Sequence, residues 1–217
     1  MTIGSQGAGA QGARAQGVSA RGIGVRYGAA VALEGVDLVA GPGTVTAVTG
    51  HSGAGKTSLL WALAGLLPSG VDGEIEIGPR SLVAQGSALS TILTARECVA
   101  LPLLDLGVSG ADAVASADRA LAEVGLEESG SHLSEELSGG QQQRVAVARG
   151  IALTRALLAR GAAVLLADEP TSELDHDNRE RVVALLRGLA DEGACVVVTT
   201  HDPEVAEAAD AVLALDV

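Results

Sequence analysis

The stretch VTGHSGAGKTSLL, from Val48 to Leu60, combines the end of an apolar strand, a glycine-rich loop and the start of an apolar helix. It matches the pattern G-x-x-x-x-G-K-[ST] with Gly50, Gly55, Lys56 and Thr57 at the fixed positions. Glycines let backbone N–H groups point at a polyphosphate, and the N-terminus of the following helix adds positive potential. The stretch therefore predicts a nucleotide-binding loop, here called the phosphate loop, made of Gly50, His51, Ser52, Gly53, Ala54, Gly55, Lys56, Thr57 and Ser58.

Lys56 is the only lysine among the 14 basic residues of the chain. An ammonium group on a flexible stem reaches between phosphate oxygens inside a tight loop, where the planar fork of arginine fits less well. The hydroxyl of Thr57 is expected to take a place on Mg²⁺. The alternative is a structural turn in a chain with 29 glycines. The lysine, the threonine and the strand–helix context together favour the binding loop.

A second site segment is VLLADEP, from Val164 to Pro170, an apolar strand that ends in two acids. Asp168 at a strand end can hold the hydration shell of Mg²⁺. Glu169 can accept a proton from an attacking water. Paired acids after a strand are often only the start of a helix, and the phosphate loop upstream is what favours the catalytic interpretation.

Composition limits the classes of protein that this chain can be. Its 217 residues suffice for one medium domain with a sizeable core, and with 1% aromatic residues that core must consist of Leu, Val, Ile and Ala. A net charge of −13 argues against a nucleic-acid partner, which requires a basic face. Cys98 and Cys195 have no metal or redox spacing, which indicates a reduced, cytoplasmic compartment.

The order of apolar segments predicts strands alternating with helices, and hence a parallel sheet covered on both faces. Strands are expected over 22–27, 31–40, 44–50, 73–78, 81–85, 161–170, 194–200 and 211–217. Helices are expected over 55–67, 94–129, 141–160 and 176–192 and from Pro203. No apolar run is long enough for a membrane span, and the start lacks the apolar region of a signal peptide, so any spans are expected in another chain.

The segment LSGGQQQRVAVAR, from Leu137 to Arg149, places a serine and two glycines before a helix and forms a second backbone donor cluster. It resembles the signature motif of ABC-type ATPases. The other motifs of that family lie along the chain in the order expected for it, some before this segment and some after it. The resemblance covers about residues 19–215. Gln85 resembles the Q-loop glutamine, Asp175 ends a D-loop-like TSELD, and His201 resembles the switch histidine. Tyr27 resembles the aromatic residue that stacks on adenine. By themselves, Tyr27 would be a half-buried strand residue and His201 a helix cap.

The resemblance implies an α/β fold of the P-loop NTPase type, with a mainly parallel sheet flanked by helices, an N-terminal antiparallel β segment and an inserted helical subdomain. The implied boundaries are a disordered tail at 1–17 and an ABC ATPase domain at 18–217. Within that domain the core would comprise 18–85 and 141–217, and the helical subdomain about 86–140.

The resemblance also implies an ATP- and Mg²⁺-dependent mechanism shared between two copies. Two ATPase domains, a homodimer or paired subunits, would join head to tail, with each ATP between the phosphate loop of one and Ser138, Gly139, Gly140 and Gln141 of the other, near Asp175. Glu169 would orient and deprotonate water, His201 would hold the γ-phosphate, and Gln85 and Asp168 would surround the metal together with Thr57. ATP hydrolysis to ADP and phosphate would then drive transport.

The quoted motifs are similar to ATPase subunits of lipoprotein-release and macrolide-efflux-type exporters. This similarity implies a separate integral membrane permease, a peripheral place on the inner face of the cell membrane, and a surface for that partner at about 86–103. Two departures concern the spacing: Gln141–Asp168 is longer than usual by about seven residues, close to two helical turns, and Lys56–Gln85 is shorter. Cys98 also replaces the usual asparagine.

Three other functions remain open from the sequence. A non-transport ABC ATPase that regulates a membrane partner would use the same motor. An ABC ATPase acting on DNA or ribosomes would be expected to carry coiled-coil insertions, tandem domains or basic arms, and this chain has none. A binding module without hydrolysis is disfavoured because Glu169 and His201 are both present.

Overall fold

The computed structural model describes residues 16–86 and 88–215, so the first fifteen residues of the predicted tail lie outside the described residues. The strands are β1 (Val18–Tyr27), β2 (Ala30–Ala40), β3 (Val45–Thr49), β4 (Val71–Ile77), β5 (Arg80–Val83), β6 (Val164–Asp168), β7 (Cys195–Thr199) and β8 (Ala211–Ala214). The helices are α1 (Lys56–Ala64), α2 (Ala95–Asp105), α3 (Gly110–Glu123), α4 (Gly139–Leu158), α5 (His176–Asp191) and α6 (Pro203–Glu207). Two 3₁₀ turns, at Glu127–Ser129 and Ser134–Glu136, lie between α3 and α4.

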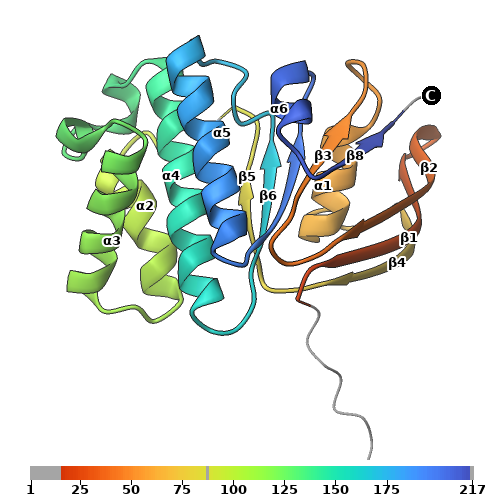
Figure 1. Ribbon diagram of the computed structural model, residues 1–217, viewed down its shortest axis with the longest axis horizontal. Helices are drawn as coiled ribbons and strands as arrows, with labels where there is room; N and C mark the ends of the chain where they lie inside the picture. Colours follow the sequence, from red (N-terminus) through yellow and green to blue (C-terminus); the bar gives the residue numbers. More distant parts are fainter. Residues whose placement is uncertain (1–15, 87, 216–217) are drawn as a thin grey trace, which may run out of the picture.

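Five parallel strands form the central sheet in the order β5-β6-β7-β3-β8 (Figure 1). Every residue of β6 and β7 is buried, as expected for apolar strands covered on both faces. Burial also raises the pKa of the Cys195 thiol, in β7, to about 11, consistent with an inert apolar role. The predicted parallel sheet is confirmed, and its five carboxyl ends meet at one edge.

Successive side chains of the central strands enter two different cores, because a strand alternates its side chains between the two faces of a sheet. Val164, Leu166 and Val197 face the antiparallel sheet and α1. Leu165 and Val196 face the cluster formed with α2, α3, α4 and α5. Valine and leucine thus fill both faces of one sheet, without any phenylalanine in the chain.

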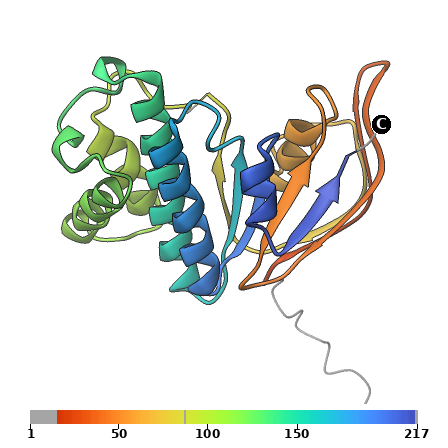
Figure 2. The ribbon, with the colours of Figure 1, turned by 45° about the horizontal axis from the view of Figure 1, so that its top comes forward.

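The N-terminal strands form a separate antiparallel sheet in the order β2-β1-β4, as expected from the resemblance (Figure 2). Helix α1 packs between this sheet and the central one, with Leu59, Leu60 and Leu63 fully buried. On the other face, α4 approaches the sheet closely at Gly150, where a Cβ would lie 2.4 Å from the Val83 side chain.

Helix α1 ends earlier than the leucine spacing predicts. Gly65 adopts a left-handed conformation with φ 72° and caps the helix at Ala64, so Leu66 and Leu67 lie outside it. Leu66 is exposed, at 58% of its surface. The expected helix over 55–67 is therefore wrong at its end. None of the helices in the described ranges is long and apolar enough to cross a membrane.

Candidate ATP-binding and catalytic site

The loops that follow four neighbouring parallel strands meet around one cavity at the carboxyl edge of the central sheet. The phosphate loop follows β3, the paired acids end β6, His201 follows β7 and Gln85 follows β5. This edge is where open α/β sheets bind their ligands. The cavity, of about 500 Å³, is lined by Ala32, Ser52, Gly53, Gly55, Lys56, Thr57, Ser58, Gln85, Glu169 and His201.

The phosphate loop takes its shape from glycines in conformations that other residues rarely adopt. Gly53 and Gly55 have φ values of 89° and 88°. A Cβ on Gly55 would lie 2.5 Å from the Leu33 side chain and 2.6 Å from the carbonyl oxygen of Ala32. Gly55 therefore serves both the turn and the close approach of the loop to β2. Of the remaining loop residues, Ala54 is buried and His51 is exposed.

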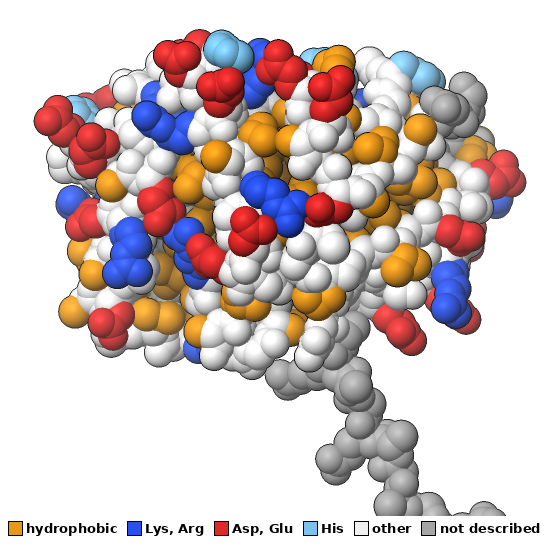
Figure 3. All heavy atoms as spheres, in the orientation of Figure 1, with side chains coloured by type: hydrophobic (Ala, Val, Ile, Leu, Met, Phe, Trp, Pro, Cys, Tyr) orange, Lys and Arg blue, Asp and Glu red, His pale blue; other side chains and the backbone are white. Residues whose placement is uncertain are grey.

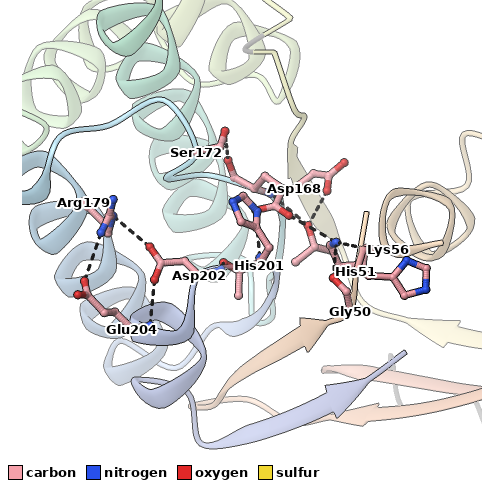
Figure 4. Close-up of polar contacts among 12 residues, drawn as sticks. Gly50, His51, Lys56, Asp168, Ser172, Arg179, His201, Asp202 and Glu204 are labelled. Atoms are coloured by element: carbon pink, nitrogen blue, oxygen red, sulfur yellow. Dashed lines mark hydrogen bonds and ion pairs between the residues drawn. The ribbon is translucent and has the colours of Figure 1, made fainter. Parts of the chain in front are cut away.

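Lys56 lies at the start of α1, and its ammonium group points back into the loop (Figure 4). Its Nζ donates to the carbonyl oxygens of Gly50 at 2.9 Å and His51 at 3.2 Å. It also lies 3.7 Å from Oε1 of Glu169. The residue is only 9% exposed, so the positive charge of the only lysine in the chain has a fixed position inside the phosphate loop.

Glu169 stands between Lys56 and His201. Its second carboxylate oxygen, Oε2, lies 2.9 Å from Nδ1 of His201, and the backbone N–H of His201 lies 3.4 Å from the same oxygen. Glu169 is 6% exposed, and its own N–H donates to the carbonyl and hydroxyl oxygens of Thr199, each at 3.1 Å. A buried carboxylate with an open cavity beside it and a histidine in contact can accept a proton from water and keep its position.

Asp168 is suited to hold a hydrated metal ion. It is 1% exposed, and Oδ1 accepts a hydrogen bond from the Thr199 hydroxyl at 2.5 Å. Among the described residues, Oδ2 is buried without a hydrogen-bond partner. A buried carboxylate oxygen with no protein partner is usually satisfied by a bound water or ion. The hydration shell of Mg²⁺ would provide one, with Thr57 and Gln85 on the wall of the adjacent cavity.

Tyr27 and Gln85 differ in how closely they are tied to the cavity. Gln85 lines it and is exposed, two residues beyond the end of β5. Tyr27 is not among the lining residues, is 47% exposed, and donates from its hydroxyl to Ser58 at 3.2 Å. Its ring thus lies at the side of the phosphate loop, where a base could stack on it.

The signature segment, Ser138 to Gln141, lies at a second cavity and not at the first. Ser138 caps α4 and forms a capping box with Gln141, with distances of 3.3 and 2.9 Å. This second cavity, of about 320 Å³, is lined by Ser138, Gly140, Gln141, Arg144, Glu173, Leu174, Asp175 and Asn178. The backbone N–H of Asn178 is the main cause that lowers the pKa of the Asp175 carboxyl. One chain therefore brings together only part of the predicted site.

Several residues that shape the site were not identified from the sequence. Thr199 binds both Asp168 and Glu169, because residue 199 of β7 pairs with residue 168 of β6. Gln143 is 1% exposed and reaches the carbonyl oxygen of Glu169 at 3.5 Å. Two features of the sequence could have indicated these residues. Gln143 is the third glutamine of the run after the signature glycines, and Thr199 belongs to the double threonine before His201. Ala32, Arg144, Glu173 and Asn178 line the two cavities without any such signal.

Comparisons with known proteins agree with this geometry. The family model described as ABC transporter matches residues 33–172. The lipoprotein-releasing system ATP-binding protein LolD of Chromohalobacter salexigens is 39% identical in an alignment of 204 positions that covers 85% of this chain and 82% of the relative. The macrolide export ATP-binding/permease protein MacB of Marinobacter nauticus is 36% identical over 83% of this chain, which spans only 30% of that longer protein.

Solved structures extend the comparison to the whole fold. The dimeric post-hydrolysis state of the ATP-binding cassette MJ0796, bound to ADP and Pi, superposes with a TM-score of 0.81 and 30% sequence identity. The superposition covers 92% of this chain and 94% of that one. A second dimeric structure of the same bacterial ABC transporter cassette gives a TM-score of 0.80 at 31% identity.

Proposed function

The chain belongs to the ABC transporter family as an ATP-binding, ATP-hydrolysing cassette similar to LolD and MacB, and on that premise we propose that two copies close on ATP and drive a separate membrane subunit. The observation that carries the proposal is the position of Glu169. Its carboxylate lies between Lys56 and His201 on the wall of the phosphate-loop cavity. A general base, a phosphate-binding cation and a γ-phosphate contact are thus within reach of one ligand.

In this proposal each residue of the cavity has one task. The phosphate loop and Lys56 bind the β- and γ-phosphates, and Tyr27 stacks on the base. Glu169 orients the attacking water and accepts its proton, while His201 keeps contact with the γ-phosphate. Asp168, Gln85 and Thr57 would hold Mg²⁺, which neutralises charge that develops on the phosphate oxygens. Positioning and charge neutralisation supply most of the catalysis in phosphoryl transfer.

The separation of the two cavities supports a composite site made by two copies. The signature segment presents the N-terminus of α4, a favourable place for a phosphate group, but this segment does not line the phosphate-loop cavity of its own chain. A second copy, turned head to tail, would bring its signature segment onto that phosphate. The MJ0796 structures are dimeric, which supports the pairing of two copies.

A membrane permease is the proposed partner of the ATPase dimer, which would then be peripheral on the inner face of the membrane. The names of the LolD and MacB relatives support this assignment. The segment at about 86–103 is the proposed contact surface for that partner, and its Ile92 is 81% exposed and Leu101 50% exposed.

The test of the catalytic assignment is Glu169→Gln. We expect ATP turnover to fall by about a hundredfold or more, because removal of a general base typically loses that factor, while ATP still drives dimer formation. Steady-state phosphate release and sedimentation velocity measure the two properties. Glu128→Gln, at an exposed carboxylate outside both cavities, is the matched control and should behave as wild type. Unchanged turnover in Glu169→Gln would contradict the assignment of Glu169 as the general base.

The composite site is tested in the Glu169→Gln background by adding Ser138→Arg. A bulky cation in the signature segment should prevent the second copy from closing, so ATP-driven dimerisation should be lost. ATP binding by each monomer should remain, because the phosphate loop is intact. A double variant that dimerises with ATP as well as Glu169→Gln would contradict the head-to-tail arrangement.

A further inference from the structure

The ring of His201 is held in place by its loop more than by packing. Its side chain is 67% exposed, yet Nδ1 lies 2.9 Å from Glu169. The loop backbone is fixed on both sides of it. The N–H of Thr200 donates to the carbonyl oxygen of Val48 at 3.0 Å, and the N–H of Asp202 donates to the hydroxyl of Thr200 at 2.9 Å. Whatever holds Asp202 therefore also sets the position of the histidine before it.

Asp202 divides its carboxylate between two elements (Figure 4). Oδ1 accepts the N–H of Glu204 at 2.9 Å and caps α6. Oδ2 lies 3.1 Å from Nε of Arg179, which comes from the first turns of α5. The second arm of Arg179 reaches Glu204 at 3.4 Å. The side chains of Arg179 and Asp202 are only 29% and 17% exposed.

This ion pair is different from an ordinary surface pair. The Nε atom of Arg179 is buried and, within the described residues, has no aligned hydrogen bond, so Asp202 is its nearest source of charge compensation. Removal of Asp202 would leave the buried Nε without its nearest carboxylate, and the Arg179 guanidinium would keep only its contact with the more exposed Glu204. The pair also joins two segments that follow catalytic residues along the chain, the helix that begins after Asp175, six residues beyond Glu169, and the loop of His201.

We propose that Arg179 is a positioning residue for ATP hydrolysis. By pairing with Asp202 it fixes the loop that presents His201 to Glu169, and it ties that loop to the start of α5. The inference rests on the role proposed above for His201. Arg179 touches none of the residues that line the phosphate-loop cavity through a described hydrogen bond or ion pair, so its effect on turnover must pass through the loop.

The direct experiment replaces Arg179 with Met, which keeps the length of the side chain and removes its charge. We expect kcat to fall about tenfold with little change in KM for ATP, because a small displacement of a catalytic group slows the chemical step. Arg179→Lys, which can still pair with Asp202, should recover most of the loss. Arg187→Met removes ion pairs to Asp191 and Asp210 from the same helix and should keep kcat at the wild-type level.

A double-mutant cycle with His201→Ala separates positioning from a general structural effect. If Arg179 acts through His201, adding Arg179→Met to His201→Ala should lower kcat by less than twofold further. An equal loss in both backgrounds would overturn the proposal. So would wild-type kcat in Arg179→Met while His201→Ala is inactive, a result that leaves the proposed function intact. Wild-type turnover in His201→Ala would overturn the role of the histidine itself, and this inference with it.

A spectroscopic measurement keeps the cycle decisive if His201→Ala has too little turnover to measure. The chain has four histidines, so their ring C–H resonances can be assigned by single substitutions. Arg179→Met should shift the resonance of His201 and leave that of His132 in place. A His201 resonance that does not move would overturn the proposal.

Discussion

Glu169 has a backbone conformation that a glutamate rarely adopts. Its φ of 47° lies in the left-handed region, which costs a residue with a side chain about 1–2 kcal/mol. The N–H of Glu169 is held by Thr199, and its carbonyl oxygen accepts from the Ser172 hydroxyl at 3.1 Å and from Gln143. The surrounding contacts thus stabilise a strained turn that aims the carboxylate into the cavity.

Gly55 supports a stability prediction at the same scale. Gly55→Ala should lower the free energy of unfolding by about 3 kcal/mol, because it combines a left-handed φ with overpacking against Leu33 and Ala32. Gly53→Ala is the control: its φ differs from that of Gly55 by one degree, but apart from its chain neighbours no atom of the described residues lies within 4 Å of the added Cβ. A loss of only about 1 kcal/mol is therefore expected.

Urea unfolding of the two variants gives the comparison. Equal losses in Gly55→Ala and Gly53→Ala would mean that the contact with β2 does not matter. ATP binding should be weaker in Gly55→Ala even where the protein is folded, because the loop must move to accept the methyl group.

The sequence identified a site residue wherever a motif contained it. It did not identify residues whose place in the site depends on strand register. Lys56, Glu169 and His201 lie together in the cavity as the motifs predict. Thr199 and Arg179 were not identified, because their contacts depend on which residues become neighbours after the sheet and helices assemble. Thr199 lies two residues before His201, but that position does not indicate Asp168 as its partner, and Arg179 lies outside the motifs.

At the scale of elements, Asp210 joins the start of β8 to β3. Its carboxylate accepts the N–H of Val45 at 2.8 Å and pairs with Arg187, and these contacts lower its pKa below the ordinary value of 3.8. A lowered pKa contributes stability that is fully present above the ordinary value. That contribution is lost as the pH falls through the folded-state value.

Asp210→Asn should therefore be less stable than wild type at pH 7. The difference should shrink as the pH falls below 3.8, where the wild-type carboxyl becomes protonated. Urea unfolding across this range measures it, with Asp191→Asn as the control that shares Arg187 but holds no strand in the described contacts. A difference that stays constant with pH would show that the carboxylate charge is not what joins the strands.

Most elements could be predicted because their apolar periodicity is clear. The central strands lie where short apolar segments place them, and α4 and α5 lie where helical spacing places them. The end of α1 could not be found by spacing, because Leu66 and Leu67 continue the pattern past the capping glycine. The order of strands in the sheet is likewise set by packing across both cores and not by the local sequence.

At the scale of the whole molecule, the net charge of −13 opposes pairing of two copies. On the face shown in Figure 3, carboxylates and arginines are interspersed, and much of the acidic excess is exposed. Salt should weaken this repulsion, since the Debye length falls from about 30 Å at 0.01 M to about 8 Å at 0.15 M. We therefore expect the ATP-bound dimer of Glu169→Gln to tighten as sodium chloride is raised over this range.

Sedimentation velocity at several salt concentrations, with ATP kept saturating, tests this expectation. Weaker dimerisation at higher salt would mean that ion pairs across the interface outweigh the overall repulsion. A monomeric control, Glu169→Gln with Ser138→Arg, shows whether salt changes the sedimentation of the single copy.

The overall architecture could be predicted from motif order, but the division of the site could not be derived from one chain's spacing. Only the geometry of the described residues shows that the signature segment and the phosphate loop line separate cavities. The predicted boundaries of core and helical subdomain stay predictions.

The near absence of aromatic residues gives the molecule an internal optical probe. Trp61 is the only tryptophan, is 38% exposed, and lies in α1, the helix whose first residue is Lys56. Its emission comes from one defined place, without contributions from other indoles, and Tyr27 is the only other emitter. We therefore expect nucleotide binding at the N-terminus of α1, or closure of a second copy over it, to change the fluorescence of the unlabelled wild-type chain.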